Sequence, residues 1–254
     1  STPLYSSAAS DVYKRQAHKH VPFMENNPEK AIKNNIGGTL ALALAAIDNN
    51  VQTFVFVSTD KAANPTSIMG ATKRIGELLI NDATRKGHID GRSARLPTVI
   101  VRSGAPNAAA SGFESGMFRE PLNGLPSVVP VGEETIMVVG SAQNTATCIQ
   151  MLADIDGDDL GPDRAVGVPG LSATVSEMLA VLEEVGGPKA RSLVEMKYDP
   201  DVDALVRSWP AALDDRRGRE LGLPADADLE SMVRAYAETP VSYTHLPLTT
   251  NREV

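Results

Sequence analysis

The sequence has a single cysteine, few aromatic residues and no long apolar run. One cysteine, Cys148, excludes an intramolecular disulfide and fits a reducing compartment such as the cytoplasm; we interpret it as a buried helix residue and not as a nucleophile. The longest apolar run is far too short to span a membrane, and no segment resembles a signal peptide. The net charge is −8 and no basic stripe carries interleaved aromatics, so nucleic acid is not an expected partner.

Two motifs that would indicate a bound ligand are also missing. A dinucleotide site needs a Gly-x-Gly-x-x-Gly turn between a strand and a helix, and the chain contains no such turn. Its one early glycine pair, Gly37-Gly38, lies within a helical pattern, where it suggests close backbone packing. His18 and His20 could indicate a metal, but no third ligand has a suitable spacing, so no metal site is predicted.

What is present is an alternation of helical and strand-like segments. Asn27 and Pro28 are typical of a helix start, and a buried apolar stripe is expected to follow at Ile32, Ile36, Leu40, Leu44 and Ile47. The apolar run at 53–58 predicts a buried parallel strand. A second helix is predicted from Ile68 to Thr84, burying Ile68, Ile75, Leu78 and Leu79, and a second strand at 98–101. This alternation is typical of an α/β fold.

After residue 102 the pattern becomes mixed. Helices are predicted at 113–122, 141–155, 175–185 and 229–237, and short strands at 127–131 and 135–139. Thr174 and Glu177 have the spacing of a capping box, which predicts where the third of these helices begins. The second half is therefore expected to be a smaller mixed α/β region.

The segment 58–73 carries the most chemical information. Asp60 and Lys61 place an acid and a base directly after the predicted strand, where open α/β sheets hold their ligands. Met69 and Lys73 are four residues apart and share one helix face. Taken alone, Asp60 and Lys61 could equally form a solvated ion pair at a turn, and Lys73 could be an ordinary surface lysine.

This segment resembles the active-site segment of the extended short-chain dehydrogenase/reductase superfamily, whose helix usually reads Tyr-x-x-x-Lys. The motifs Ser-Thr-Asp-Lys and Met-Gly-Ala-Thr-Lys resemble more specifically those of the nucleotide-sugar 4,6-dehydratases of polysaccharide synthesis. In that subfamily Met replaces the Tyr. This resemblance covers about residues 17–75. It implies that Asp60 and Lys61 act as acid and base in eliminating water, while Thr59 polarises the C4 oxygen of the sugar. Lys73 would contact the nicotinamide ribose of NAD or NADP.

The same resemblance assigns roles to three residues further upstream. Lys19 and His20 would lie on a loop near the substrate. Asn35 would be the structural asparagine of the proton-relay helix, although an ordinary amide on a helix face explains it equally well.

From about residue 76 onward a second resemblance takes over. The chain is similar there to the C-terminal half of D-erythronate-type dehydrogenases, an NAD-dependent branch of the same superfamily, over roughly 76–238. The motifs that carry this likeness include Asp90-Gly91-Arg92, Arg95-Leu96-Pro97-Thr98, Pro106-Asn107-Ala108-Ala109-Ala110-Ser111 and Arg119-Glu120-Pro121-Leu122. It makes Asn107, Ser111 and Arg119 candidate substrate contacts. Arg119 could pair with a substrate carboxylate or, alternatively, lie near Glu120 on the surface. Ser103 and Ala105 depart from the pattern, which has Pro and Lys there.

The two resemblances together predict a chimera of two genes with a partial Rossmann-type parallel sheet, truncated at its front. Residues 1–16 are interpreted as a non-native leader and 239–254 as a non-native tail. Residues 17–110 would be the C-terminal half of an NAD-binding domain, with an incomplete cofactor site, and 111–238 a substrate-binding region.

By family, the expected activity is oxidation of a small sugar acid by an NAD(P)-dependent enzyme. The alternative is a nucleotide-sugar 4,6-dehydratase, since Met69 cannot supply the ionised oxygen that a dehydrogenase needs. A third reading is a chimeric remnant that binds no dinucleotide and is inactive. The expected partners are small molecules and a second copy of the chain in a homodimer.

Overall fold

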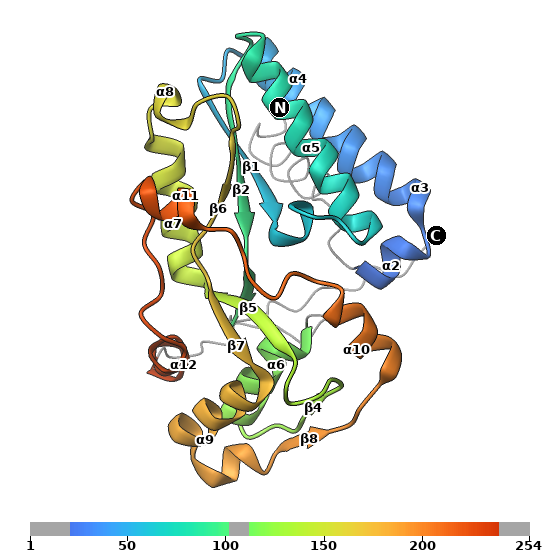
Figure 1. Cartoon of the computed structure of the whole chain (residues 1–254), viewed down its shortest axis with the longest axis vertical. Coiled ribbons are helices and arrows are strands. Elements are labelled where there is room, and N and C mark those ends of the chain that lie inside the picture. Colours follow the sequence, from blue (N-terminus) through green and yellow to red (C-terminus); the bar gives the residue numbers. More distant parts are fainter. Residues whose placement is uncertain (1–20, 102–111, 239–254) are drawn as a thin grey trace, which may run out of the picture.

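The computed structural model describes residues 21–101 and 112–238. Three parallel strands form its main sheet in the order β1 (Thr53–Thr59), β2 (Asp90–Leu96) and β6 (Ala165–Gly167). Helix α5 (Ile68–Arg85) covers one face of this sheet and α7 (Ala142–Asp154) the other (Figure 1). A parallel sheet between two helical layers confirms the predicted α/β class.

Hydrophobic patterning predicted neither β2 nor the short strand β6, and β2 is the more informative of the two. Its sequence, Asp-Gly-Arg-Ser-Ala-Arg-Leu, is mostly polar, yet Arg92 and Ser93 are only 1% and 2% exposed. β2 lies in the centre of the sheet, hydrogen-bonded to β1 on one side and β6 on the other. Its polar side chains are therefore buried by position, and each must find partners inside the protein.

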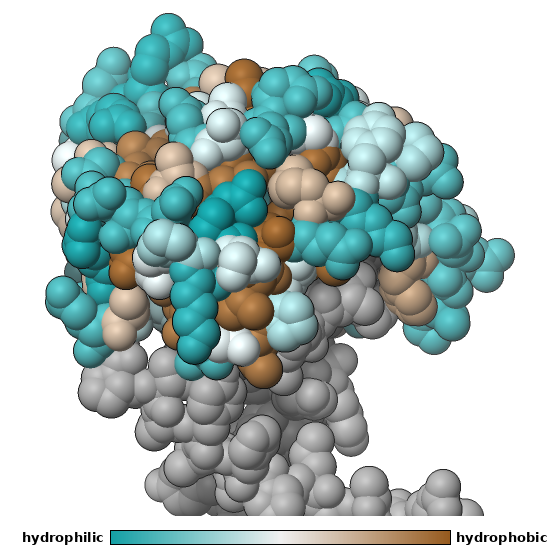
Figure 2. Space-filling model, turned by 90° about the horizontal axis from the view of Figure 1, so that it is seen from below, coloured by the Kyte–Doolittle hydropathy of each residue, from teal (hydrophilic) through white to brown (hydrophobic). Residues whose placement is uncertain are grey.

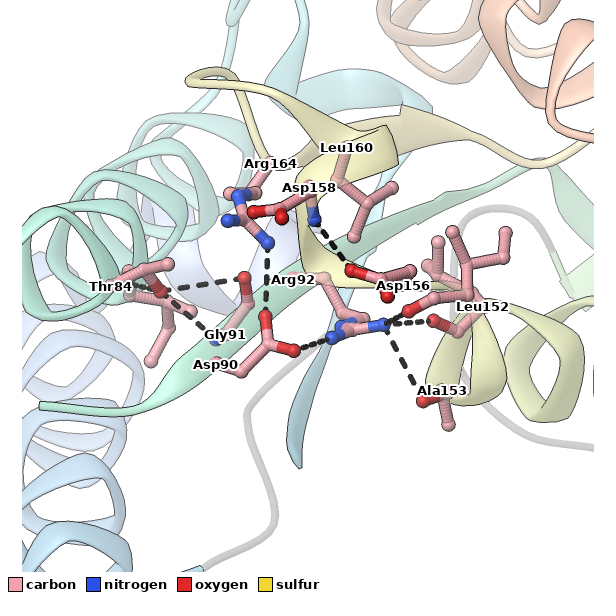
Figure 3. Close-up of polar contacts among 12 residues, drawn as sticks. Thr84, Asp90, Gly91, Arg92, Leu152, Ala153, Asp156, Asp158, Leu160 and Arg164 are labelled. Atoms are coloured by element: carbon pink, nitrogen blue, oxygen red, sulfur yellow. Dashed lines mark hydrogen bonds and ion pairs between the residues drawn. The ribbon is translucent and has the colours of Figure 1, made fainter. Parts of the chain in front are cut away.

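Arg92 finds those partners at the end of α7, as Figure 3 shows. Its Nη1 donates to the carbonyl oxygens of Leu152 at 2.8 Å and Ile155 at 2.5 Å, and its Nη2 pairs with Asp90. Asp90 in turn accepts from Nη1 of Arg164 at 2.9 Å. A cation at the C-terminus of a helix satisfies its free carbonyl groups and complements its dipole. Arg92 therefore fixes α7 against the sheet.

We predict that Arg92→Met lowers the free energy of unfolding by roughly 2–4 kcal/mol, because the carbonyl groups at the end of α7 lose their buried donor. Urea unfolding at constant m-value measures this. Arg85→Met is the matched control, since Arg85 and its partner Asp82 are exposed and such pairs contribute about 0–1 kcal/mol. Equal effects of the two substitutions would contradict the assigned role of Arg92.

A layer of helices precedes β1 in the chain. It consists of α2 (Val21–Glu25), α3 (Pro28–Ala31), the π-helical segment η1 (Ile32–Gly37) and α4 (Gly38–Asp48). The predicted start at Asn27 and Pro28 is confirmed, but the predicted buried stripe is wrong. Ile32, Leu40 and Leu44 are between 43% and 52% exposed. The buried side chains are instead small or polar: Ala31, Asn35, Thr39, Ala43 and Ala46.

The same reversal occurs on α5. Ile75 and Leu78 are 40% and 51% exposed, whereas the buried positions include Met69, Thr72 and Glu77. α4 and α5 pack against each other (Figure 1), and their small facing residues permit this approach. Ile75 and Leu78 face outward, whereas Met69 and Ile80 of the same helix are buried. Added Cβ atoms at Gly37 or Gly38 would meet no atom within 4 Å, so the expectation of close packing at this pair is also wrong.

The second half forms two smaller sheets with helices around them, which agrees with the smaller mixed α/β region predicted there. One has the order β3–β5–β7 with mixed direction, and the other pairs β4 with β8. The strands are β3 (Thr98–Ile100), β4 (Ser127–Val129), β5 (Ile136–Ser141), β7 (Leu171–Thr174) and β8 (Val194–Met196). The helices are α6 (Gly112–Leu122), α8 (Gly157–Leu160), α9 (Val175–Arg191), α10 (Pro200–Arg207), α11 (Arg216–Glu220) and α12 (Leu229–Glu238).

Local signals placed α9 correctly at its start. Thr174 and Glu177 form the predicted capping box, and Gly187 adopts a positive φ of 76° at a kink within the helix.

Seen from the end formed by the smaller sheets, the surface is largely hydrophilic with apolar side chains between (Figure 2). None of the helices in residues 21–101 and 112–238 combines the length and apolarity needed to cross a membrane.

Candidate active site

The carboxyl end of β1 holds a buried ion pair. β1 ends at Thr59, and the short 3₁₀ turn η2 (Asp60–Ala62) follows. Asp60 is 2% exposed and Lys61 is 8% exposed. Nζ of Lys61 lies 3.0 and 3.2 Å from the two carboxylate oxygens of Asp60, and the Thr59 hydroxyl donates to Asp60 at 2.8 Å. The structure thus brings three predicted site residues together, with Asp60 and Lys61 buried and Thr59 half-buried.

Trp209 covers this pair from a distant part of the chain. Nζ of Lys61 lies 4.4 Å from the centre of the Trp209 ring, an arrangement in which the ring face attracts the cation. Next to it, the hydroxyl of Thr66 donates to the Ser208 carbonyl at 3.1 Å, which ties the loop after η2 to the end of α10. Sequence reasoning gave Trp209 no role, because 148 positions separate it from Lys61 and no local pattern links the two.

Gly70 allows α5 to approach the ion pair. A Cβ at this position would lie 2.3 Å from the backbone oxygen of Lys61, which real Cβ atoms do not tolerate. The helix begins just before it, where the Ser67 hydroxyl accepts from the Gly70 amide at 3.2 Å. The close approach of the Lys61 backbone therefore explains why the Met-Gly-Ala-Thr-Lys segment has a glycine at this position.

Lys73 lies along β1 on the same helix. Its Nζ donates to the Val57 carbonyl at 2.8 Å and lies 4.8 Å from the ring centre of Phe56. Burial lowers the pKa of Lys73 to about 8, against the opposing influence of the Glu77 carboxylate. Met69, four residues earlier, is 4% exposed and belongs to the apolar core. The Met69 thioether offers no proton acceptor of useful strength.

Glu77 fixes the position of α5 against the sheet. Its carboxylate accepts from Nε and Nη2 of Arg95 at 2.9 and 2.7 Å, from Ser58 at 2.6 Å and from Arg74 at 2.8 Å. Burial alone would raise the pKa of Glu77, but the hydrogen bonds from Arg95, Ser58 and Arg74 keep it below its usual value. One carboxylate therefore joins α5 to the carboxyl ends of β1 and β2.

Asn35 lies in the π-helical segment η1 and is 2% exposed. Its Nδ2 lies 3.1 Å from the Thr72 hydroxyl and 3.4 Å from the Met24 sulfur. The amide therefore joins three helices behind the site, which is consistent with the structural role that the resemblance implied.

Arg119 is 5% exposed in α6, and its Nε donates to Glu120 at 3.1 Å. Of the two alternatives for Arg119, the structure shows the one in which it lies near Glu120. The pair is inside the protein, however, and not on the surface as that alternative held. The other four predicted substrate contacts, Lys19, His20, Asn107 and Ser111, lie outside the described residues. Within the described residues, no three His, Cys, Asp or Glu side chains are grouped as metal ligands.

Glu114 is a candidate that sequence reasoning missed. It is 0% exposed in the first turns of α6, and neither carboxylate oxygen has a hydrogen-bond partner. Burial raises the pKa of Glu114 to about 8; the Lys61 ammonium opposes this rise and the Asp60 carboxylate adds to it. The Thr98 hydroxyl also lowers the pKa of Glu114, although its position does not meet the geometry of a hydrogen bond to the carboxylate. A signal was available, because Glu114 shares a helix face with Met117 and Phe118, which are fully buried.

We predict that Glu114 makes stability fall as the pH rises. Burial raises the pKa of the folded-state carboxyl to about 8, against 4.5 for an unperturbed glutamate, so between these values the folded state binds more protons than the unfolded state. Its contribution is full below about pH 4.5 and is lost as the pH rises to about 8, on the order of 5 kcal/mol in total.

Urea unfolding across this pH range, compared between the wild type and Glu114→Gln, measures the effect. Glu183→Gln on the exposed side of α9 is the matched control for the loss of one charge. If wild type and Glu114→Gln show the same pH dependence, Glu114 ionises normally and the prediction is wrong.

Comparisons with known proteins agree with both resemblances. The model of a family described as polysaccharide biosynthesis proteins matches residues 4–112, and so runs past the position near residue 75 where the second likeness takes over. D-erythronate dehydrogenase of Cupriavidus necator is 41% identical over 182 residues, which cover 72% of this chain and 56% of that protein. The probable polysaccharide biosynthesis protein EpsC of Bacillus subtilis is 50% identical over 93 residues, covering 37% of this chain and 14% of that protein.

Among solved structures, a nucleoside-diphosphate-sugar epimerase from Agrobacterium tumefaciens superposes with a TM-score of 0.81. It is 31% identical, and the match covers 92% of this chain and 76% of the epimerase. The chain spans about half the length of the curated dehydrogenases that it matches.

Proposed function

The chain belongs to the extended short-chain dehydrogenase/reductase superfamily, and on that premise we propose that it is part of a cytoplasmic NAD(P)-dependent oxidoreductase that acts on a small sugar acid of the D-erythronate type. The observation that carries the proposal is the placement of two ammonium groups at the carboxyl end of β1, where Lys61 is buried beside Asp60 and Lys73 is half-buried against the Val57 carbonyl. Open α/β sheets bind their ligands at this edge. The long match to D-erythronate dehydrogenase supports the substrate class.

Lys73 is the described residue that fits a nicotinamide cofactor. Its ammonium lies at the strand end, where a ribose hydroxyl could accept from it in place of the Val57 carbonyl. The bound cofactor would supply the hydride acceptor. No Gly-x-Gly-x-x-Gly turn occurs in the sequence, so no residue of this chain is assigned to the pyrophosphate.

Asp60, Lys61 and Trp209 have separate roles in this proposal. Asp60 keeps the Lys61 ammonium in place, and the Trp209 ring excludes water from one side of it. Oxidation of a hydroxy acid also needs a group that takes the hydroxyl proton. Met69 has no ionisable atom, so among the described residues Lys61 and Asp60 are the substitutes that we assign to this role in place of the usual tyrosine.

A nucleotide-sugar 4,6-dehydratase is the second candidate, and the same residues favour it. Thr59, Asp60 and Lys61 form one connected group, as the dehydratase resemblance requires. In this reading Asp60 and Lys61 act as acid and base in the loss of water, with Thr59 directed at the C4 oxygen. Arg119 would contact the substrate in either reaction only by leaving Glu120.

The decisive test uses a hybrid in which residues 21–238 follow the N-terminal strands of a D-erythronate dehydrogenase. We predict that Met69→Tyr raises NADH formation from D-erythronate by ~10²–10⁴-fold, because Lys73 would favour the phenolate and so restore a general base. Lys73→Met in the tyrosine form is the control and should remove the gain. The unextended chain should form no NADH, as the reading of an inactive remnant requires.

Equal rates with Met and Tyr at position 69 would contradict this prediction. They would show that Asp60 or Lys61 supplies the base, and the dehydratase assignment would then be preferred.

We also propose that the chain forms a homodimer through the outer faces of α4 and α5. The exposed apolar residues of this surface, named here the helix face, are Ile32, Leu40, Leu44, Ile75 and Leu78. The two helices pack side by side (Figure 1), so the exposed residues of both can contribute to one interface. Contiguous apolar surface of this kind is typical of protein interfaces.

We predict that the double substitution Leu40→Asp and Leu78→Asp converts the dimer into a monomer, because it buries two charges without partners in the interface. Light scattering after gel filtration measures the mass. Leu125→Asp is the matched control, since Leu125 is 53% exposed in the smaller region and outside the helix face. A monomeric wild type would rule out this interface.

A further inference from the structure

The position of Trp209 depends on α10, the short helix that it follows. Its amide donates to the Val206 carbonyl in the last turn of α10 at 3.0 Å, and its ring lies over Nζ of Lys61 at 4.4 Å. α10 has eight residues, and a helix of this length is not stable in water without contacts to the rest of the protein. The contacts that anchor α10 therefore also decide whether the ring covers Lys61.

Asp203 is the polar anchor of α10, and it is only 5% exposed. Its Oδ1 accepts from the Gly132 amide and the Thr135 hydroxyl, both at 3.3 Å. Its Oδ2 accepts from Nε of Arg207 at 2.6 Å and from the Tyr198 hydroxyl at 3.3 Å. Gly132 and Thr135 belong to the segment that joins β4 to β5. One buried carboxylate thus ties α10 to the smaller sheets.

This anchor adds something that the other contacts of α10 do not supply. Asp199 already caps the start of the helix, so Asp203 is not needed for that purpose. Val202, Leu205 and Val206 pack on the apolar core, but such packing has no preferred direction. Hydrogen bonds are directional, and four of them on one carboxylate fix the rotation of α10 and its place along its axis.

Beyond α10, the chain is held once more before it reaches Lys61. The Thr66 hydroxyl donates to the Ser208 carbonyl at 3.1 Å, directly before Trp209. The ring itself has no such bond, because its Nε1 finds no hydrogen-bond partner within the described residues. Packing, the attraction to the Lys61 ammonium and the position of α10 are therefore what place the ring.

We propose that Asp203 is a positioning residue for Lys61. By anchoring α10 to the segment 132–135 it holds the Trp209 ring over the ammonium, and the ring keeps Lys61 on Asp60. Without the anchor the ring moves away and Lys61 is free to adopt other rotamers. The consequence for catalysis rests on the proposed function, because it requires Lys61 to act on the substrate. The contact between α10, Trp209 and Lys61 does not.

The contact is measured on the complete chain, without substrate or cofactor. Trp209 is the sole tryptophan, so the fluorescence of the protein reports on this ring alone. A charge close to an indole ring displaces its emission, because excitation changes the dipole of the ring. We expect Lys61→Met to shift the emission maximum in the wild type. The same substitution should give a smaller shift in Asp203→Asn, whose amide NH₂ cannot accept from the donors that face it.

Asp201→Asn is the matched control, because Asp201 lies on the same helix and loses the same charge but is exposed. The shift caused by Lys61→Met should keep its full size in that variant. Each variant is also unfolded in urea, since a helix that is only displaced leaves the cooperative transition in place. An absent shift in the wild type, or an equal shift in Asp203→Asn, would overturn the proposal.

Arg207→Met decides the question if Asp203→Asn does not fold. The Arg207 side chain is 45% exposed, so its replacement leaves the core intact. It removes the shortest bond to Asp203 and the ion pair with Glu134, which also ties α10 to the segment 132–135. The shift caused by Lys61→Met should again become smaller, and an unchanged shift would count against the anchor.

The readout also separates this proposal from the proposed function. If the shift depends on Asp203 but the hybrid enzyme oxidises no sugar acid, the positioning of Lys61 stands and the assigned reaction fails. If the hybrid is active and the shift does not depend on Asp203, the reaction stands and Asp203 has no positioning role.

Discussion

The ion pair between Asp60 and Lys61 is the interaction on which this part of the structure depends. Two adjacent charges are withdrawn from water at the end of a strand, where their desolvation is unfavourable unless every contact is satisfied. The Thr59 hydroxyl, the backbone amide of Lys61 and the Trp209 ring provide those contacts. Because Trp209 comes from the far end of the chain, the site requires both halves of the molecule to fold together.

A second buried carboxylate, Glu77, determines where Lys73 lies. It accepts hydrogen bonds from β1, β2 and its own helix, and this fixes the rotation of α5 about its axis. Lys73 then reaches the Val57 carbonyl along the strand, and Gly70 faces the backbone of η2. Glu114 is another buried acid, and its environment differs from those of Glu77 and Asp60. Glu77 is saturated with donors, Asp60 has one cation, and Glu114 has none of its own. The differing partners explain why one of them keeps its proton.

Several elements were predictable from local signals alone. The start of the helical layer at Pro28, the strand β1, the capping box of α9 and the terminal helix α12 all follow from caps and short-range periodicity. The strand β2 and the buried faces of α4 and α5 did not. In β2 a buried arginine replaces the apolar residues that patterning looks for. On α4 small residues occupy the inner face, and on α5 the buried Thr72 and Glu77 share that face with Met69 and Ile80. Hydrophobic periodicity identifies an apolar face, but which face is buried depends on the neighbour that covers it.

The sequence by itself determined the α/β class and the family likeness, and it named Asp60, Lys61 and Lys73 as candidate site residues, because they lie within fourteen positions of one another around a single strand and helix. Their placement follows from the local geometry of a strand, a tight turn and a helix. Only the tertiary structure decided that Trp209 covers the pair, that Arg119 turns to Glu120 inside the protein and that Glu114 is fully buried. These contacts join residues tens of positions apart or depend on burial. Both are set by the packing of whole elements, which no local pattern encodes.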